Sequence, residues 1–435
     1  MPNEIATELN EIIRGQNPYV SRMLSVLGTE LYFPKGILSQ SAEARAKATF
    51  CNATIGIARG GGEAMHLPCV MEQFRGFAAD DVLPYAPATG KPELRAKWAD
   101  AMLRKNPTLR GKPMSMPVVT SGITHGLSLL ADMFVDPGDV VLLPRKLWGN
   151  YKMIFGVRHG ADIRHYPFFS EAGGFDTGGF AQALREHAGS GKLVVLLNFP
   201  NNPTGYSLTV QEARKVCEIL TELAESGCNV VAVCDDAYFG LFYEEDVLKE
   251  SLFAHLAGSH ERLLAAKLDG ATKEDYVWGL RVGFMTFSTS APSERLYEAL
   301  ESKTGGAIRG NISNCSHLSQ AVLLRAMQNE RYEREKEERF AVMQARAARV
   351  KGVLGQSKFS AVWTRYPFNS GYFMCLRLRD TNAEQFRLRL LEEYGTGVIA
   401  TGKKDIRVAF SCIEEQDIPE FFETMFTCAR DMKPT

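Results

Sequence analysis

The sequence lacks any apolar run long enough to cross a lipid bilayer. Its longest apolar stretches, such as Leu193–Leu197 and Val230–Val233, contain only four or five residues, whereas a transmembrane helix needs about 20. The first residues, Met1–Ile5, show neither the basic segment nor the apolar run of a secretory signal peptide. We therefore expect a protein without membrane association.

The sequence also lacks an excess of one charge. Its 435 residues include 50 Lys and Arg against 51 Asp and Glu, for a net charge of −1. Proteins that bind nucleic acid usually carry a basic surface, and the segment 1–80 contains no basic helix-turn-helix pattern. We expect no nucleic-acid partner.

Paired cysteines are missing as well. The nine cysteines are scattered along the chain without a CxxC pair or zinc-ligand spacing. An odd number of cysteines without a framework is typical of free thiols in a reducing compartment. Together with the N-terminal residues, this predicts a cytoplasmic protein without a metal site.

Short apolar segments alternate with helical segments through the middle of the chain. A β-strand pattern occurs at Val118–Thr120, Val140–Leu143, Leu193–Leu197 and Val230–Cys234, and Val210–Ser226 has helical periodicity. Strands separated by helices form parallel sheets with helices on both faces. The length exceeds that of a single core, so we expect more than one structural unit.

The pattern changes after about residue 310. A charged amphipathic stretch, Leu318–Gly352, predicts one or two helices, and three short strands follow at Tyr372–Leu378, Val398–Ala400 and Ile406–Phe410. We therefore expect an α/β protein with a large domain over 81–310 and a smaller α+β domain over 311–435. Residues 1–80 would form an N-terminal arm and part of the small domain.

Three polar segments follow this pattern in a fixed order. Asn198–Gly205 and Asp235–Tyr238 each come directly after a predicted strand, and Lys273 precedes Arg281 by eight residues. Ligands bind at the carboxyl ends of strands in open α/β sheets. A buried lysine beside a cation can lose its proton and act as a nucleophile. The strand ends thus predict a ligand site, and the lysine–arginine spacing is a weak pattern when taken alone.

In combination, these segments resemble the cofactor site of fold type I pyridoxal-phosphate (PLP) aminotransferases of class I/II, the group that includes aspartate aminotransferase. The resemblance covers roughly residues 80–415. It implies a mainly parallel, seven-stranded-type sheet flanked by helices, and a homodimer with shared active sites. It also implies transfer of an amino group between an L-amino acid, of aspartate or glutamate type, and a 2-oxo acid.

The resemblance assigns the cofactor contacts. Lys273 would hold PLP covalently, since the nearest competitor, Lys267, lacks an arginine eight residues later. The phosphate would lie at the helix N-terminus formed by Gly122, Ile123 and Thr124, with Arg281 opposite. Thr272, next to the lysine, would add a hydroxyl. Many relatives have a serine three residues before the lysine, where this chain has Gly270, so that contact is either absent or made by another residue.

The cofactor ring would be held by four further side chains. Asp235 would pair with the pyridine nitrogen, and Tyr238 and Asn202 would hydrogen-bond the phenolic oxygen. Trp148 would stack on the ring, although a core tryptophan would give the same pattern. The resemblance makes Lys273, Asp235 and Tyr238 the catalytic residues.

The substrate contacts follow from the same resemblance. Arg407 would bind the α-carboxylate, which a guanidinium matches with two hydrogen bonds. Arg309, in Ile308–Asn314, would reach a distal carboxylate across the dimer interface, although Cys315 and Ser316 depart from the family's proline pair. Tyr85 would contact the partner subunit's cofactor phosphate.

The N-terminal segment 1–80 matches the family less well. The segments at 33–37 and 52–57 lie where relatives form the mouth of the active site, so Lys35 is a candidate for that mouth. Gly60–Gly62 suggests a flexible loop.

Two other functions remain open at this point. The same scaffold supports PLP-dependent decarboxylases and β-lyases, because the Cα bond that breaks depends on its angle to the ring and not on these motifs. A regulatory protein that senses PLP is a third possibility, but it usually carries a DNA-binding module.

Overall fold

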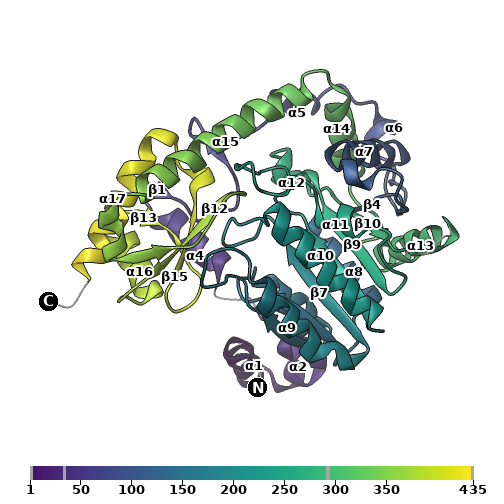
Figure 1. Ribbon diagram of the computed structural model, residues 1–435, viewed down its shortest axis with the longest axis horizontal. Helices are drawn as coiled ribbons and strands as arrows, with labels where there is room; N and C mark the ends of the chain where they lie inside the picture. Colours follow the sequence, from purple (N-terminus) through teal and green to yellow (C-terminus); the bar gives the residue numbers. More distant parts are fainter. Residues whose placement is uncertain (1–2, 33–35, 291–293, 433–435) are drawn as a thin grey trace.

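The computed structural model describes residues 3–32, 36–290 and 294–432, and it contains a larger and a smaller α/β unit (Figure 1). The larger unit is built on a seven-stranded sheet with the order β4-β10-β9-β8-β7-β5-β6. Its strands are β4 (Val118–Thr120), β5 (Val140–Pro144), β6 (Asp162–Tyr166), β7 (Lys192–Asn198), β8 (Asn229–Asp235), β9 (Leu263–Asp269) and β10 (Gly283–Ser288).

All of these strands are parallel except β10, which runs antiparallel to both of its neighbours. The four strands predicted from the sequence that belong to this sheet are present with limits shifted by at most one residue at each end. The prediction of an α/β fold with a mainly parallel seven-stranded sheet is confirmed.

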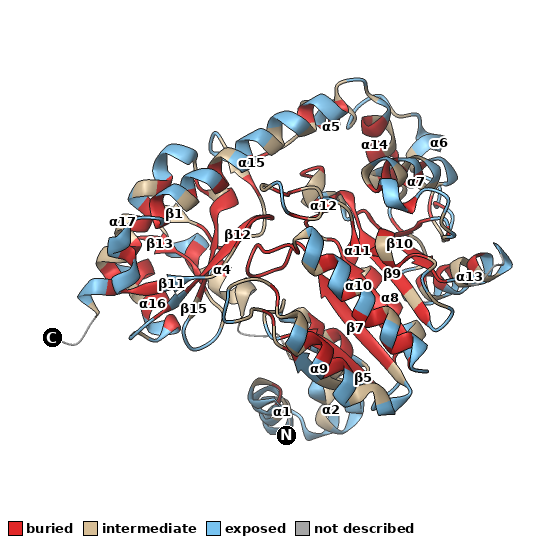
Figure 2. Ribbon diagram, viewed as in Figure 1, coloured by how far each residue is buried: buried red, intermediate tan, exposed pale blue. Residues whose placement is uncertain are grey.

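Helices cover both faces of the large sheet, so its strands are buried except for the edge strand β6 (Figure 2). Alternate residues of β5 enter different cores: Val140 and Leu142 face one side, and Val141 and Leu143 the other. The first side is covered by α9 (Thr177–His187), α10 (Val210–Glu225) and α11 (Leu252–Leu256). The second side is covered by α8 (Ile123–Phe134) and α13 (Glu294–Asn311).

The sequence explains where the predicted helix α10 starts. The Thr209 hydroxyl accepts a hydrogen bond from the Glu212 amide, and the Glu212 carboxylate accepts one from the Thr209 amide. This capping box satisfies two backbone donors at the helix start, and the helix then buries one apolar face.

The smaller unit surrounds a four-stranded antiparallel sheet. Its order is β11 (Trp363–Arg365), β12 (Phe373–Leu378), β15 (Asp405–Ala409) and β14 (Ile399–Ala400). Helices α16 (Ala383–Tyr394) and α17 (Ile418–Asp431) belong to this unit, as does α4 (Ile37–Lys47) from the N-terminal region. Strand β1 (Cys51–Asn52) pairs with β13 (Thr396–Gly397), which ties the N-terminal region to this unit.

Two helices, not one, occupy the predicted stretch after residue 310. Helix α14 (His317–Gln328) packs against α5 (Pro68–Glu72), α6 (Ala79–Val82) and α7 (Pro92–Lys105), whereas the long α15 (Tyr332–Leu354) packs mainly against α17. The domain limits at residues 80 and 310 stay predictions.

The remaining α-helices and β-strands lie near the N-terminus, with one exception. They are α1 (Glu4–Gln16), α2 (Pro18–Met23), α3 (Val26–Glu30), β2 (Arg59–Gly60), β3 (Glu63–Ala64) and the short helix α12 (Ala271–Glu274) later in the chain. Gly60–Gly62, interpreted above as a flexible loop, forms the end of β2 and the turn of the β2–β3 hairpin, and its flexibility stays a prediction. Gly61 and Gly62 have φ of 60° and 83°, which suits a two-residue hairpin turn.

Along the described residues, no helix combines the length and the apolar character needed to span a membrane.

Candidate active site

A pocket of about 250 Å³ lies between the carboxyl edge of the large sheet and the small sheet. It is lined by Ile37, Gly56, Ile123, Thr124, Trp148, Tyr151, Asn198, Asn202, Asp235, Ala237, Tyr238, Lys273, Arg281, Phe373 and Arg407. Nine of the thirteen predicted site residues are among these. The structure therefore brings together residues that are more than 280 positions apart in the sequence.

Lys273 follows strand β9 and lies in α12, with its amine 5.2 Å from the centre of the Tyr238 ring. Burial lowers the pKa of Lys273 to about 8; the nearby Asp235 carboxylate opposes this shift, and the Arg281 guanidinium adds to it. An amine with a pKa near neutrality is partly unprotonated at physiological pH and can act as a nucleophile or base.

The competing Lys267 does not line the pocket and is held in ion pairs with two carboxylates. Its amine pairs with Asp236 and lies 3.2 Å from an Asp269 carboxylate oxygen, and the side chain is completely buried away from the pocket lining. Burial disfavours the charge of Lys267, but these two carboxylates outweigh it and raise its pKa. Lys267 therefore remains protonated in a structural ion pair.

Asp235 ends strand β8 and is buried at the base of the pocket. Its carboxylate accepts hydrogen bonds from the Tyr151 hydroxyl at 2.5 Å and the Ala237 amide at 3.1 Å. Burial raises the pKa of Asp235, whereas the Tyr151 hydrogen bond and the charge of Lys273 lower it. The sequence interpretation missed Tyr151, although this residue lies only three positions after Trp148. Among the described residues, its hydroxyl donates only to Asp235.

Arg407 lies on β15 with its guanidinium buried and its charge unpaired. It donates to the Thr54 carbonyl at 2.7 Å and the Asn202 side-chain oxygen at 3.2 Å, and it lies 4.2 Å from the centre of the Phe373 ring. Its Nε has no partner, and it forms no ion pair with a carboxylate among the residues that the structure describes. A buried cation normally pairs with an anion, so Arg407 is ready for the carboxylate of a ligand.

The segment Asn198–Gly205 shapes one wall of the pocket. The Asn198 side chain donates to the Asp235 carbonyl at 3.0 Å and accepts from the Asn202 amide at 2.9 Å. The Phe199–Pro200 and Asn202–Pro203 peptide bonds are cis. The two hydrogen bonds of the Asn198 side chain hold this segment so that the Asn202 side chain lies beside Arg407.

The N-terminus of α8 and Arg281 form a cradle at another wall. Gly122 precedes the helix with φ of 78°, and a Cβ atom at this position would lie 2.4 Å from Arg281 Nη2. Only glycine combines this backbone conformation with this close approach. Backbone amides at a helix N-terminus and a guanidinium both bind phosphate.

The structure explains why Gly270 replaces a serine. A Cβ atom there would lie 2.7 Å from the Val282 carbonyl oxygen and 2.8 Å from Gly283 Cα, so no side chain fits. The phosphate contact of Thr272 stays a prediction. Its hydroxyl is buried, does not line the pocket and has no hydrogen-bond partner among the described residues.

Trp148 lines the pocket and packs edge-on against Tyr151, with 5.5 Å between ring centres. Gly56 and the Thr54 carbonyl come from the segment predicted to form the mouth of the site. Ile37, from the other segment predicted at that mouth, also lines the pocket, as does Phe373, which no sequence motif singled out. Lys35 lies outside the described residues.

Tyr85 and Arg309 do not line this pocket. Tyr85 is 88% exposed. Arg309 lies in α13, where the sequence suggested a loop, and it donates to the Ser313 hydroxyl at 2.7 Å and the Asn314 side-chain oxygen at 3.4 Å. Within one chain, the structure leaves both residues away from Lys273.

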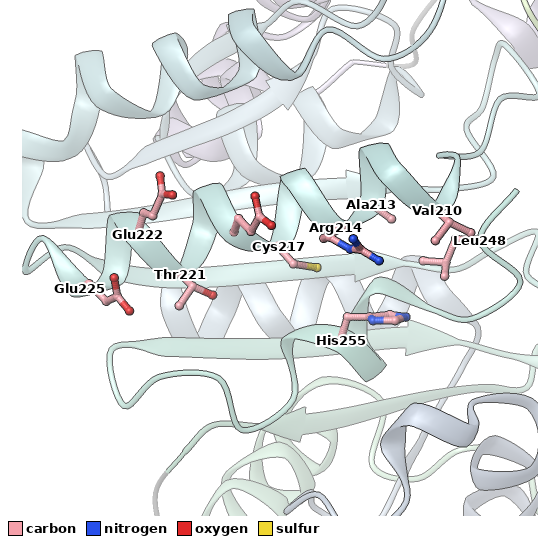
Figure 3. Close-up of a pocket in the computed structure, with 10 residues that line it drawn as sticks. Val210, Ala213, Arg214, Cys217, Thr221, Glu222, Glu225, Leu248 and His255 are labelled. Atoms are coloured by element: carbon pink, nitrogen blue, oxygen red, sulfur yellow. The ribbon is translucent and has the colours of Figure 1, made fainter. Parts of the chain in front are cut away.

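A second pocket, on the outer side of α10, contains none of these residues (Figure 3). It has a volume of about 510 Å³ and lies between α10 and α11, with Cys217 and His255 in its walls. The smaller pocket is the candidate active site because of the chemistry of its lining, which includes Lys273, Asp235 and Arg407.

The residues present fit pyridoxal phosphate. The amine of Lys273, the buried Asp235 carboxylate, the ring of Trp148 and the cradle at Gly122 and Arg281 are the groups that hold such a cofactor. The sequence pattern of the family described as "Aminotransferase class I and II" matches residues 50–425.

The chain belongs to this family. The prediction of a PLP-type aminotransferase is thereby confirmed, and enzymes of this family depend on PLP. The decarboxylase or β-lyase alternative and the regulatory alternative are not favoured, because the relatives described below are named as aminotransferases.

This aminotransferase is similar to proteins from several microorganisms. It is 26% identical over 249 residues to a probable aspartate/prephenate aminotransferase of Aquifex aeolicus, a match that spans 56% of each chain. It is 24% identical over 355 residues to an aspartate aminotransferase of Sulfurisphaera tokodaii, covering 78% of this chain and 81% of that protein.

Solved structures share the fold of the aminotransferase. A crystal structure of an aminotransferase from Anaerococcus prevotii aligns with a TM-score of 0.83 and 23% identity, covering 94% of this chain and all of that chain. A kynurenine aminotransferase from Pyrococcus horikoshii, solved in complex with PMP, aligns with a TM-score of 0.79 and 17% identity, covering 95% and 99% of the two chains.

Proposed function

We propose that this protein binds PLP at Lys273 and transfers an amino group from an L-amino acid held by Arg407 to a 2-oxo acid. One observation carries this proposal. A lysine with a lowered pKa, a buried carboxylate and an arginine without a protein carboxylate partner line the same pocket. Decarboxylation and β-elimination would use the same anchor, but family membership favours transamination.

When bound, PLP supplies an electron-withdrawing ring that stabilises negative charge on the substrate Cα. The Arg407 guanidinium binds the substrate α-carboxylate and thereby fixes Cα near Lys273. The Lys273 amine would take the Cα proton as a base and, once protonated, would return it as an acid to the adjoining carbon that carries the transferred amino group. The ionised Asp235 carboxylate holds the proton of the ring nitrogen, and Tyr151 and the Ala237 amide keep that carboxylate ionised.

Other side chains position and shield the reacting atoms. The hydroxyl of Tyr238 and the amide of Asn202 hydrogen-bond the phenolic oxygen, and Trp148 covers the ring and excludes water from it. Arg281 and the amides of Ile123 and Thr124 neutralise the phosphate. Thr272 is a further predicted contact of that phosphate.

We further propose a homodimer in which Tyr85 contacts the partner's cofactor phosphate and Arg309 reaches the partner's substrate. The two segments adjoin, because the Asn314 amide donates to the Ala86 carbonyl at 2.8 Å. Large apolar side chains are exposed around them, among them Leu83 at 78% and Ile312 at 40%. An exposed apolar surface of this kind supports an interface. A distal carboxylate at Arg309 would favour aspartate or glutamate as donor.

A cytoplasmic location is part of the proposal. All nine cysteines are unpaired thiols in the structure, which suits a reducing compartment.

The test combines covalent trapping with an acceptor assay. Protein incubated with PLP and reduced with borohydride should carry the adduct on Lys273, and Lys273→Ala should lose it, whereas Lys303→Ala, which removes an exposed amine, should keep it. A panel of L-amino acids should yield 2-oxo acids only when a 2-oxo acid acceptor is present. An adduct on Lys267, or product formation without an acceptor, would contradict the proposal.

A further inference from the structure

One buried side chain contacts the backbone of Lys273 and is not used by the proposed mechanism. The Tyr372 side chain is completely buried, and its hydroxyl donates to the Lys273 carbonyl oxygen at 2.8 Å. Burial raises the pKa of this hydroxyl well above its ordinary value, so it keeps its proton and remains a donor. Among the described residues, no other side chain forms a hydrogen bond with the backbone of Lys273.

This hydrogen bond matters because α12 is too short to fix its own end. The helix contains only four residues, so its last carbonyl groups lack a partner within it. The chain leaves the helical conformation at once, since Tyr276 has φ of 57°. The Tyr276 amide also approaches the Lys273 carbonyl, at a longer distance of 3.3 Å. The position of the lysine backbone therefore depends on contacts from outside the helix.

Tyr372 brings this contact from the smaller unit. It directly precedes β12, which pairs with β15 so that Cys375 lies opposite Arg407. The residue after Tyr372 is Phe373, whose ring centre lies 4.2 Å from the Arg407 guanidinium. The sheet that carries the arginine proposed to bind the substrate carboxylate therefore also holds the backbone of the proposed anchor lysine.

The ring of Tyr372 makes a second contact near the same lysine. It packs against the Tyr238 ring, with 5.4 Å between the ring centres and 71° between the ring planes. The Lys273 amine lies 5.2 Å from the centre of that Tyr238 ring. Substitution by phenylalanine separates the two contacts, because it keeps the ring and removes only the hydroxyl.

We infer that Tyr372 is a positioning residue, whose hydroxyl sets the distance between the Lys273 amine and the Cα atom of a substrate held at Arg407. The inference rests on the proposed function, in which Lys273 moves the Cα proton. Proton transfer requires the two heavy atoms to lie within hydrogen-bonding reach, and a displacement of about 1 Å can reduce a rate about a hundredfold. A hydroxyl that ties the lysine backbone to the sheet of Arg407 holds this distance.

The variant Tyr372→Phe tests the inference in the PLP-loaded protein. Its kcat should fall about tenfold, because the amine is no longer held at the reacting carbon. KM, and the calorimetric affinity for the unreactive monocarboxylate butyrate, should change less than about twofold, since the contact acts on the chemical step and not on binding. The primary isotope effect with a Cα-deuterated amino acid should increase, because proton transfer becomes slower relative to the other steps.

Hydrogen exchange gives a readout that needs neither cofactor nor catalysis. In the protein without PLP, the amides of residues 271–281 should exchange faster in Tyr372→Phe than in the wild-type protein. The lysine carbonyl has then lost its side-chain donor, and the short helix opens more often. Mass spectrometry of the peptide that covers this segment measures the difference.

The matched control is Tyr243→Phe. The Tyr243 hydroxyl donates to the Gly371 carbonyl at 2.6 Å, so this variant removes the same kind of hydrogen bond from the adjoining residue and leaves Lys273 bonded. The two variants should lose similar stability in urea, but Tyr243→Phe should keep the wild-type kcat, isotope effect and exchange rate at 271–281. Unchanged kcat and isotope effect in Tyr372→Phe, or equal changes in both variants, would overturn the inference.

Failure of this inference differs from failure of the proposed function. If the wild-type protein transaminates and Tyr372→Phe matches it in kcat and isotope effect, only the positioning role is wrong. If the wild-type protein yields no 2-oxo acid from any amino acid with any acceptor, the proposed function itself fails.

Discussion

The properties of the central side chains depend on individual neighbours. Lys273 has its lowered pKa because it is buried beside Arg281, and Asp235 stays able to ionise because Tyr151 donates to it. The two groups oppose each other's shift, since an ionised Asp235 stabilises a protonated Lys273. Changing one contact should therefore move a pKa without changing the fold.

Tyr151→Phe tests this at Asp235. The hydrogen bond at 2.5 Å stabilises the ionised carboxylate, so its loss should raise the pKa of Asp235 further above the ordinary value. Asp235 would then take up a proton at higher pH. We expect the acidic limb of the kcat/KM profile to move to higher pH by roughly one unit.

Tyr166→Phe is the matched control for this pH profile. Its buried hydroxyl donates to the Leu196 carbonyl at 2.7 Å and contacts no titratable group of the site. An unchanged acidic limb in Tyr151→Phe, or the same displacement in both variants, would contradict the role of Tyr151.

At the scale of elements, two short connections hold the site. The turn before α8 carries Gly122, and α12 carries Lys273. The first is constrained by close approach to Arg281, and the second by buried ion pairs of the two residues that follow the lysine. Each constraint predicts a different consequence of mutation.

Gly122→Ala should weaken cofactor binding. The new Cβ would need a left-handed backbone and would overlap Arg281 Nη2, so the guanidinium must move out of the cradle. We expect a loss of about 1–2 kcal/mol in folding stability. The dissociation constant for PLP, measured by absorbance titration, should increase. Gly149→Ala serves as control, since a Cβ there meets no atom within 4 Å. Equal PLP affinity in both variants would show that the cradle at Gly122 does not bind the cofactor phosphate.

Lys336→Met should destabilise the segment around Lys273. The Lys336 amine from α15 lies 2.7 Å from Asp275 and 3.1 Å from Glu274, which also pairs with Lys105 at 2.6 Å. Removing one partner leaves a buried carboxylate unpaired. We expect a loss of about 3 kcal/mol in the free energy of unfolding, measured in urea.

The control for this unfolding experiment is Lys358→Met. Lys358 pairs with Glu423 at the surface, where the two side chains are 43% and 45% exposed. Such pairs contribute less than about 1 kcal/mol. A similar loss in both variants would show that the buried ion pairs of Lys336 contribute no more to stability than the surface pair of Lys358.

At the scale of the whole molecule, the site is assembled from three regions of the chain. The N-terminal region supplies Ile37 and Gly56, the large sheet supplies Asp235 and Lys273, and the small sheet supplies Arg407. The proposed dimer would add a fourth contribution from the partner. Its test must therefore use two chains.

Mixed dimers of Lys273→Ala and Tyr85→Ala should recover activity. In a mixed dimer, the Tyr85→Ala chain keeps its Lys273 and receives Tyr85 from the other chain. One of the two sites of the dimer is therefore complete. Random mixing after mild unfolding should restore about a quarter of the wild-type rate. No recovery, although native mass spectrometry shows mixed dimers, would place Tyr85 outside the partner's site.

Local pattern and spacing were enough to predict much of this protein. The alternation of apolar strands and helices, the end of β8 at Asp235, and the eight residues between Lys273 and Arg281 can all be read along the chain. These features depend on backbone periodicity and covalent distance, which neighbouring residues determine. The same information predicted a parallel sheet but not that β10 runs antiparallel within it.

The tertiary structure decided the contacts between residues that are far apart in sequence. Tyr151 and Asp235 are 84 residues apart, and Arg407 and Asn202 are 205 residues apart, so no local pattern could pair them. The ion pairs of Lys267 with Asp236 and Asp269, the absence of a carboxylate beside Arg407 among the described residues, and the exclusion of any side chain at Gly270 are likewise consequences of packing. Burial and electrostatic partners follow from which segments meet in space, and that is settled only when the chain has folded.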